Sequence, residues 1–131
     1  TLARIGVDPT TYKLVDGSGL SRKDLISPQA LVQTLQGMAK SPYNQVFRAS
    51  LPVGGKNGTL KYRFRDLSPE VLVQAKTGTM TGVVTLAGYV NAPNYGPVVF
   101  SIMVNQTEQP IKVVRNAIDE IVVHLSQLQR C

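Results

Sequence analysis

The pattern of apolar and polar positions predicts three consecutive β-strands in the second half of the chain. They cover residues 71–80, 82–91 and 98–105, segments rich in Val, Thr, Tyr and Phe that are separated by short turns. β-Branched and aromatic side chains favour strands, and connections this short make consecutive strands antiparallel neighbours. We therefore predict a three-stranded antiparallel sheet.

Apolar residues at helical spacing appear before and after these strands. Ser27 and Pro28 suit the N-cap and the first helical position, so we predict a helix from Pro28 to about Lys40. A second, shorter helix is expected over residues 43–50. Pro110 opens a last helix, whose apolar residues form one broad stripe: Ile111, Val114, Ala117, Ile118, Ile121, Val122 and Leu125. The expected fold class is α+β, an antiparallel sheet with N-terminal helices and with the C-terminal helix packed on it.

Length and charge narrow the class of protein. A chain of 131 residues, 43% of them hydrophobic, is long enough for one domain with a real core. The net charge of +6 raises the question of nucleic acid, and Lys61, Arg63 and Arg65 alternate along one segment. On a strand this spacing would place the three cations on one solvated face, and no short window is dense in Lys and Arg. We predict no nucleic-acid partner; an anionic polymer or a carboxylate-bearing ligand fits the charge equally well.

Several other classes of protein are disfavoured. Cys131 is the single cysteine, so no disulfide can form within the chain. Residues 77–107 carry no charge, but Gly, Pro, Asn and Thr interrupt them, which favours buried strands over a membrane helix. No His, Cys, Asp and Glu residues have metal-ligand spacing, and glycine motifs that bind phosphate are absent, so we predict no metal and no cofactor.

Two short motifs are candidates for chemistry. Lys76, Thr77 and Gly78 form the tripeptide K-T-G towards the end of the first predicted strand, where the alternative is an ordinary exposed lysine at a strand end. The segment from Asp16 to Arg22 reads Asp-Gly-Ser-Gly-Leu-Ser-Arg, and its two glycines indicate a tight, specific loop. We expect Asp16 to bond its own loop backbone, and we consider a direct catalytic role for Ser18 the less favoured alternative.

The order of these motifs resembles a known family. The Asp-Gly-Ser-Gly-Leu-Ser-Arg loop precedes a Leu-Pro…Gly-Thr-Leu segment, then K-T-G on a strand, then Gly88-Tyr89-Val90 and a final helix. This order resembles the penicillin-binding D-Ala-D-Ala carboxypeptidase/endopeptidase (S13) family over nearly the whole chain. K-T-G belongs to the motif set of penicillin-binding proteins and β-lactamases. The resemblance implies part of the β-lactamase/DD-peptidase fold and an extracytoplasmic, periplasmic place of action on peptidoglycan.

The resemblance also implies roles for particular residues. The Lys76 ammonium and the Thr77 hydroxyl would hold the terminal carboxylate of a stem peptide ending in D-Ala-D-Ala, or that of a β-lactam. Gly78 would keep a side chain out of the groove where the substrate backbone approaches. The backbone N–H of Thr79 would be one of two oxyanion-hole donors.

The sequence departs from the family at the nucleophile. None of its serines has a lysine three residues later or an asparagine two residues later, so S-x-x-K and S-x-N are both absent. Tyr89-Val90-Asn91 imitates a Y-x-N variant but follows K-T-G, and we interpret it as coincidence. We therefore expect residues 1–131 to be the C-terminal part of a penicillin-binding domain, inactive by itself. The edge of the third strand should then pair with the N-terminal part of the protein or with a second copy.

Other readings remain open at this point. The chain could be a non-catalytic module that binds peptidoglycan peptides or β-lactams through Lys76 and Thr77. Thr1 could act as an N-terminal nucleophile, although no clear strand begins there. His124 lies beside the apolar stripe of the last helix, where a packed or surface histidine is far more common than a catalytic one.

Overall fold

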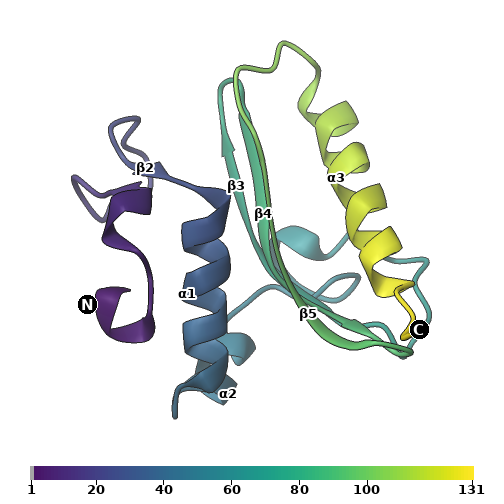
Figure 1. The fold of residues 1–131 in the computed structure, drawn as a ribbon. Helices are drawn as coiled ribbons and strands as arrows, with labels where there is room; N and C mark the ends of the chain where they lie inside the picture. Colours follow the sequence, from purple (N-terminus) through teal and green to yellow (C-terminus); the bar gives the residue numbers. More distant parts are fainter. Residues whose placement is uncertain (1) are drawn as a thin grey trace.

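The computed structural model describes residues 2–131 and builds them around one antiparallel sheet (Figure 1). Its strands are β3 (Val73–Met80), β4 (Val83–Ala92) and β5 (Gly96–Val104), and they lie in chain order with β4 in the centre. The predicted sheet is therefore confirmed, with strand ends shifted by one or two residues. Gly82, at φ +73°, lies in the tight turn between β3 and β4, a conformation that favours glycine.

Helices cover both faces of this sheet. α1 (Pro28–Lys40) and α2 (Asn44–Ala49) lie on one face and α3 (Ile111–Ser126) lies on the other (Figure 1). The Ser27 hydroxyl accepts a hydrogen bond from the Ala30 N–H at 3.0 Å, so the predicted N-cap is confirmed. The α+β fold class and the packing of the last helix on the sheet are confirmed as well.

The apolar stripe of α3 is narrower than the sequence predicted. Val114, Ile118 and Val122 are buried against the sheet, whereas Ile111 and Ile121 are 44% and 49% exposed. Ala117 is also exposed. The helix lies mainly over β4, so Ala117 and Ile121 on its outer flank have no neighbouring element to cover them, whereas Ile111 is the first residue of the helix. The predicted stripe is therefore only partly buried, with these three positions exposed.

The segment with alternating cations is not a strand. It follows a short 3₁₀-helix, η3 (Gly58–Leu60), and runs through turns. The Arg63 guanidinium bonds the Asp119 carboxylate of α3, with Nε at 3.1 Å from both carboxylate oxygens. The expectation of a row of three cations on one strand face was wrong, because Arg63 anchors this segment to α3.

The N-terminal segment adds a small ladder that the sequence did not reveal. β1 (Tyr12–Lys13) pairs with β2 (Leu25–Ile26), after the 3₁₀-helices η1 (Leu2–Ile5) and η2 (Pro9–Thr11). Strands of two residues carry no periodic pattern, so no sequence signal could have identified them.

The loop between β1 and β2 is held by its own carboxylates. The Asp16 carboxylate accepts hydrogen bonds from the Ser18 hydroxyl and from the Ser18 backbone N–H, as the sequence predicted. Both bonds lower the pKa of Asp16, and the bond from the Ser18 hydroxyl has the larger effect. Asp24 closes the loop by accepting from the Val15 N–H at 2.6 Å.

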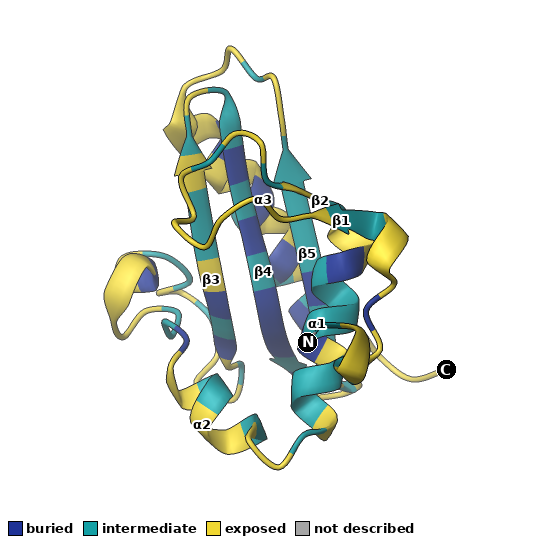
Figure 2. Ribbon diagram, turned by 90° about the vertical axis from the view of Figure 1, so that its left-hand side faces the viewer, coloured by how far each residue is buried: buried dark blue, intermediate teal, exposed yellow. Residues whose placement is uncertain are grey.

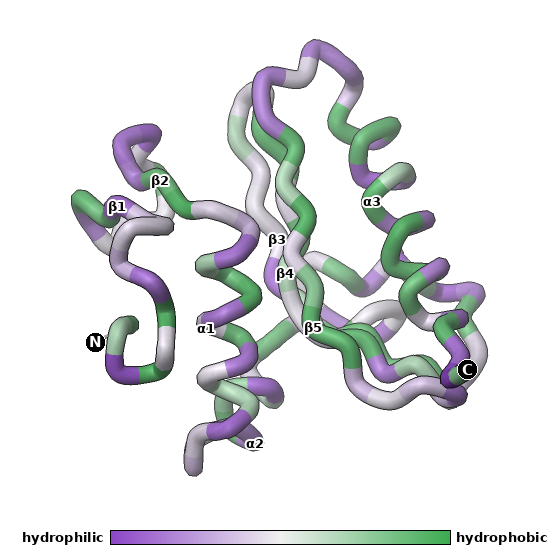
Figure 3. The backbone as a smooth tube through the Cα atoms, in the orientation of Figure 1, coloured by the Kyte–Doolittle hydropathy of each residue, from purple (hydrophilic) through white to green (hydrophobic). Residues whose placement is uncertain are grey.

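Two hydrophobic clusters pack against the sheet, one on each face. Leu86, Ile118 and Val122 belong to the larger cluster under α3, and Leu35 and Tyr89 belong to the smaller one under α1 and α2. The central strand β4 is the most buried strand in Figure 2. Figure 3 shows the apolar side of α3 turned towards the sheet. β4 therefore contributes side chains to both hydrophobic clusters.

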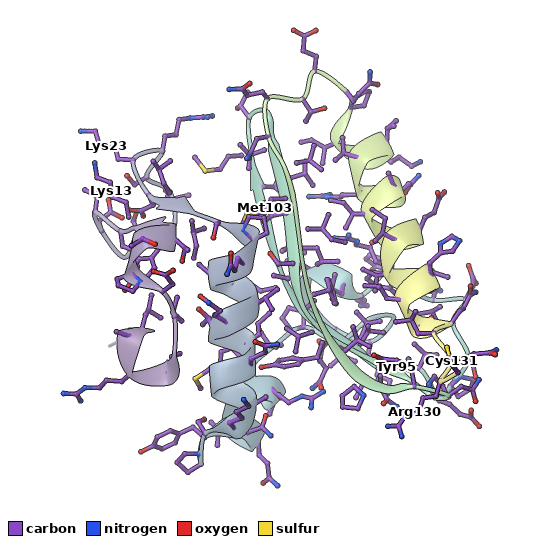
Figure 4. The ribbon with its side chains drawn as sticks, viewed as in Figure 1. Lys13, Lys23, Tyr95, Met103, Arg130 and Cys131 are labelled. Carbon is purple, nitrogen blue, oxygen red and sulfur yellow. The ribbon has the colours of Figure 1, made fainter. Side chains whose placement is uncertain are left out.

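The chain ends beside the turn that joins β4 to β5. The Arg130 side chain donates from Nε to the Tyr95 carbonyl oxygen at 3.1 Å, and the exposed Cys131 follows it (Figure 4). This contact ties the segment after α3 to the sheet.

Candidate functional site

The site is built on β3, which is an edge strand of the sheet. Its beginning is covered, because the Gly54 N–H donates to the Val73 carbonyl oxygen at 2.9 Å and the Ala75 N–H donates to the Pro52 carbonyl oxygen at 3.1 Å. Among residues 2–131, no backbone hydrogen bond continues this pairing beyond Ala75. The stretch from Lys76 to Met80 therefore presents an open edge.

The direction of the backbone groups follows from strand alternation. In an antiparallel strand, the N–H and C=O of every second residue point to the same side. Ala75 bonds outward to Pro52, so Thr77 and Thr79 also direct their N–H and C=O groups outward, while Lys76 and Gly78 pair with β4. The geometry is that of an edge to which one more extended segment can be added.

The side chains of the K-T-G segment alternate between the two faces. Lys76 and Gly78 lie opposite Ala87 and Thr85 of β4, on the face covered by α1 and α2. Thr77 and Thr79 point to the α3 face. The Lys76 ammonium donates to the Thr77 carbonyl oxygen at 2.9 Å, so its charge lies at the open edge.

The hydroxyls of the two threonines have partners on the α3 face. The Thr77 hydroxyl lies 3.0 Å from the Thr59 hydroxyl of η3. The Thr79 hydroxyl accepts from Arg115 of α3 at 3.2 Å. Neither Thr59 nor Arg115 could be identified from the sequence as neighbours of K-T-G, because each is far away in the chain and belongs to another element.

Gly78 lies directly opposite a side chain of β4. A Cβ atom at this position would lie 2.5 Å from the Thr85 hydroxyl oxygen, closer than any ordinary contact. Glycine therefore leaves room for the Thr85 hydroxyl and leaves the strand without a side chain at this position.

A pocket adjoins the K-T-G segment on the face covered by α1 and α2. Its volume is about 460 Å³, and its lining is mainly apolar. It is lined by Leu31, Thr34, Leu35, Phe47, Ser50, Leu51, Lys76, Thr77, Thr85 and Ala87. A cation at the margin of an apolar pocket suits a ligand with one anionic end and an apolar body.

A polar network attaches α2 and α1 to the strands behind this pocket. Arg48 donates from Nε to the Gln74 side-chain oxygen at 3.1 Å, and the Gln74 amide donates back to the Arg48 carbonyl oxygen at 3.1 Å. The Arg48 guanidinium also lies 4.5 Å from the centre of the Tyr89 ring, and the Tyr89 hydroxyl donates to the Leu35 carbonyl oxygen at 2.6 Å. Burial raises the pKa of Tyr89, and the Arg48 charge opposes that shift.

Other residues singled out from the sequence lie elsewhere. His124 is an exposed residue of α3, where its Nδ1 lies 2.7 Å from the Glu120 carbonyl oxygen, and it lines a different pocket with Phe64 and Leu67. Ser18 belongs to the loop between β1 and β2, and Thr1 lies outside the described residues. The structure thus groups Lys76, Thr77, Gly78 and Thr79 at one edge and places Ser18 and His124 on other elements.

Residues 2–131 contain neither a metal-binding cluster nor a membrane-spanning helix. No three His, Cys, Asp or Glu side chains gather closely enough there to hold a metal ion. None of the described helices is both long and apolar enough to cross a membrane.

Comparison with known proteins places the chain in a family. The model of the D-Ala-D-Ala carboxypeptidase 3 (S13) family matches residues 1–128. A D-alanyl-D-alanine carboxypeptidase from Actinomadura sp. is 40% identical over 131 residues, covering 96% of this chain and 24% of that protein. A penicillin-sensitive carboxypeptidase A from Dictyostelium discoideum is 33% identical over 132 residues, covering 94% of this chain and 25% of that protein. The chain belongs to the D-Ala-D-Ala carboxypeptidase 3 (S13) family, and it spans about a quarter of the length of these relatives.

Solved structures agree with this assignment. Penicillin binding protein 4 from Haemophilus influenzae, in complex with a β-lactam, superposes with a TM-score of 0.80 and 26% identity, covering 97% of this chain and 31% of that one. A β-lactamase from Sphaerobacter thermophilus, 17% identical, has a TM-score of 0.71 over 99% of this chain and 52% of that one, which shows the shared fold. The predicted resemblance and the partial β-lactamase/DD-peptidase fold are therefore confirmed.

Proposed function

We propose that this chain supplies the substrate-binding edge of a serine-type D-Ala-D-Ala carboxypeptidase. The observation that carries the proposal is the open edge of β3, where Lys76, Thr77 and Thr79 present an ammonium, a hydroxyl and outward N–H groups within one short stretch. An ordinary exposed lysine at a strand end would lack this combination. Membership of the family supports the same assignment.

The substrate in this proposal is a peptidoglycan stem peptide that ends in D-Ala-D-Ala. Its extended end lies along β3 as an added strand and pairs with the outward backbone groups of Thr77 and Thr79. The Lys76 ammonium retains two N–H donors beyond the one bonded to Thr77, and these and the Thr77 hydroxyl bind the terminal carboxylate. A β-lactam presents an equivalent carboxylate, as expected for a ligand of the same edge.

The Thr79 N–H has a role in the chemical step of this proposal. A serine hydroxyl oxygen attacks the carbonyl carbon of the scissile peptide bond, and negative charge develops on the carbonyl oxygen. An N–H fixed in the sheet and directed outward stabilises that oxygen without reorganising. The C–N bond to the terminal D-alanine then breaks, its amine takes up the proton lost by the serine hydroxyl, and water hydrolyses the acyl-enzyme that remains.

The nucleophile is proposed to lie outside residues 1–131. These residues contain no S-x-x-K and no S-x-N motif, and the chain spans about a quarter of its relatives. Serine and its base act as a unit, so this chain alone is proposed to be inactive. It forms the C-terminal part of the penicillin-binding domain, and the enzyme that carries it acts on peptidoglycan outside the cytoplasm.

The other edge of the sheet supports this arrangement. β5 is the second edge strand, and its side chains towards α3 are apolar. Arg115 and Asp119 mark the side of α3 that faces β3 and η3, so the exposed flank with Val113 and Ile121 lies on the side of β5. An unpaired strand beside an exposed apolar helix flank suits added strands and a helix. We propose that the N-terminal part of the same protein occupies this edge; a second copy of the chain is the alternative partner.

Nuclear magnetic resonance titration of the 131-residue chain tests the binding proposal. We expect N-acetyl-D-Ala-D-Ala to shift the backbone amide signals of Thr77 and Thr79, and N-acetyl-L-Ala-L-Ala to shift them much less. Lys76→Ala and Thr77→Val should reduce these shifts. Lys112→Ala, in the first turn of α3, should leave them unchanged. Equal responses to both stereoisomers, or no response at β3, would contradict the proposal.

A further inference from the structure

Arg115 is a cation beside β3 that the roles assigned to the K-T-G segment leave unused. It projects from the side of α3 that faces β3, and one guanidinium nitrogen donates to the Thr79 hydroxyl at 3.2 Å. This contact joins α3 to the residue whose N–H points outward from the edge. The guanidinium therefore lies on the α3 side of the same stretch of β3 that Lys76 approaches from the other side.

The guanidinium has donors to spare. Arginine carries five N–H donors in a planar fork that matches a carboxylate. Among residues 2–131, the ion pair present in the structure is that between Arg63 and Asp119, and no carboxylate pairs with Arg115. Arg63 differs from Arg115 in this respect, because its Nε and Nη2 both donate to the Asp119 carboxylate. Arg115 keeps a full positive charge at the surface with one neutral hydroxyl as its partner.

The position suits an anionic ligand on the β3 edge. Successive residues of a strand rise about 3.4 Å, so Thr77 and Thr79 are about 7 Å apart along β3. A carboxylate bound at the Thr77 hydroxyl would thus lie two residues along β3 from the hydroxyl that Arg115 contacts. Cations from opposite faces, Lys76 and Arg115, would enclose it, and a guanidinium adds directional hydrogen bonds that an ammonium does not.

We propose that Arg115 is a carboxylate-binding residue of the β3 edge, which recognises the terminal carboxylate of the ligand together with Thr79. This inference rests on the proposed function, because it requires a carboxylate-bearing peptide on β3. It adds a residue from α3 to a site otherwise formed by β3, so the C-terminal helix takes part in substrate selection as well as in the core.

A titration with two peptides that differ in charge at the C-terminus tests this proposal. The probes are N-acetyl-D-Ala-D-Ala and its C-terminal carboxamide, added to the 131-residue chain while the Nε–H signal of Arg115 and the amide signals of Thr77 and Thr79 are followed. We expect the carboxylate, and not the carboxamide, to shift the Arg115 signal. Arg115→Ala should weaken binding of the carboxylate about fivefold to tenfold and leave binding of the carboxamide unchanged.

Two variants control for the fold and for general charge. Lys112→Ala removes a cation one turn earlier on α3, which takes part in none of the hydrogen bonds to β3 found among residues 2–131, and should leave both affinities unchanged. Arg115→Lys keeps the charge without the fork and should recover part of the loss. Circular dichroism of each variant verifies that it is folded.

The outcomes separate this inference from the proposed function. If Thr77 responds to the carboxylate but Arg115 does not, or if Arg115→Ala binds as well as the unsubstituted chain, the inference about Arg115 is wrong and the proposed function stands. A response of Arg115 that is equal for both peptides contradicts recognition of the carboxylate. Absence of any response at β3 contradicts both proposals.

Discussion

At the scale of single residues, the polar groups around β3 divide by face. Lys76 approaches the open edge from the side of α1 and α2, while Thr59 and Arg115 hold the hydroxyls of Thr77 and Thr79 from the side of α3. The outward backbone groups lie between these two sets. One substitution can therefore remove an outward backbone N–H, and a different one can remove a side chain that contacts the threonine hydroxyls.

The oxyanion role of Thr79 can be tested by removing its N–H. Thr79→Pro deletes an outward donor and leaves the ladder between β3 and β4 intact, because proline is tolerated where the N–H faces away from the sheet. In the longer protein that we propose carries this chain, we expect acylation by benzylpenicillin to slow by about 10²-fold to 10³-fold, the usual effect of losing one oxyanion donor. Thr79→Val, which keeps the N–H and loses the hydroxyl that Arg115 contacts, should slow acylation far less than the proline variant. Similar rates for the proline and valine variants would show that the N–H is not used.

Tyr89 links the pH dependence of stability to a buried hydrogen bond. Its hydroxyl donates to the Leu35 carbonyl oxygen, and burial raises the pKa of Tyr89 above its usual value near 10. Because the folded state keeps this proton longer than the unfolded state, the free energy of unfolding should fall as the pH rises above about 10.

Tyr89→Phe tests this link by urea denaturation at several pH values. At neutral pH the variant should be about 1–2 kcal/mol less stable, because the buried Leu35 carbonyl loses the hydrogen bond from Tyr89. The difference between the two proteins should shrink above pH 10. A difference that stays constant across this range would show that Tyr89 has an ordinary pKa.

At the scale of elements, the central strand depends on close approach to β3. A Cβ on Gly88 would lie 2.2 Å from the Gln74 carbonyl oxygen and 2.5 Å from the Ala75 Cα. Both are backbone atoms of β3, which cannot move aside without shifting the strand. The two strands can therefore keep their present spacing only with glycine at this position.

Gly88→Ala should destabilise the sheet and displace the site with it. We expect a loss of about 3 kcal/mol in the free energy of unfolding, the upper range for an overpacked core, together with a weaker response to D-Ala-D-Ala peptides. Gly17→Ala is the matched control, since a Cβ there meets nothing within 4 Å, and it should change stability by less than about 0.5 kcal/mol. Thermal or urea unfolding measures both; a Gly88 variant as stable as the control would mean that β3 and β4 can separate at little cost.

The elements also show where sequence reasoning succeeds. The sheet and α1 were predictable because their signals are local: β-branched runs between short turns, and a Ser-Pro helix start. The two-residue ladder of β1 and β2 was not, and neither was the attachment of Arg63 to Asp119, because both join distant segments without a periodic pattern. For the site, the K-T-G motif indicated the strand, whereas Thr59 and Arg115 depend on how η3 and α3 pack against β3.

At the scale of the whole molecule, the sheet has two different open edges. Strand alternation directs the N–H groups of Val99, Ser101 and Met103 outward along β5, and Pro97, which has no N–H, occupies another outward position. The β5 edge is continuous and lies beside the apolar flank of α3, whereas the beginning of β3 is covered by the segment around Pro52. We therefore expect association through β5 and substrate binding at β3.

Ser101→Pro tests the role of the β5 edge. We predict that the 131-residue chain associates with itself as its concentration rises, and that this substitution weakens the association by removing one outward donor and stiffening the edge. Ser101→Ala is the control, because the Ser101 hydroxyl is buried without a hydrogen-bond partner among the described residues and its loss should be harmless. Sedimentation velocity measures the association. A chain that stays monomeric at all concentrations would contradict an exposed pairing edge.

We propose that residues 1–131 supply the substrate-binding edge and that the nucleophile lies outside them. The most direct test of this proposal is denaturing intact-mass spectrometry after incubation with benzylpenicillin. The sample is the 131-residue chain by itself and, in parallel, a preparation that contains more of the same protein, followed by peptide mapping. We predict no covalent adduct on residues 1–131 in either sample, and an adduct on a serine outside them in the second. A penicilloyl adduct mapped to any residue of this chain would contradict the proposal that it contributes the binding edge and not the nucleophile.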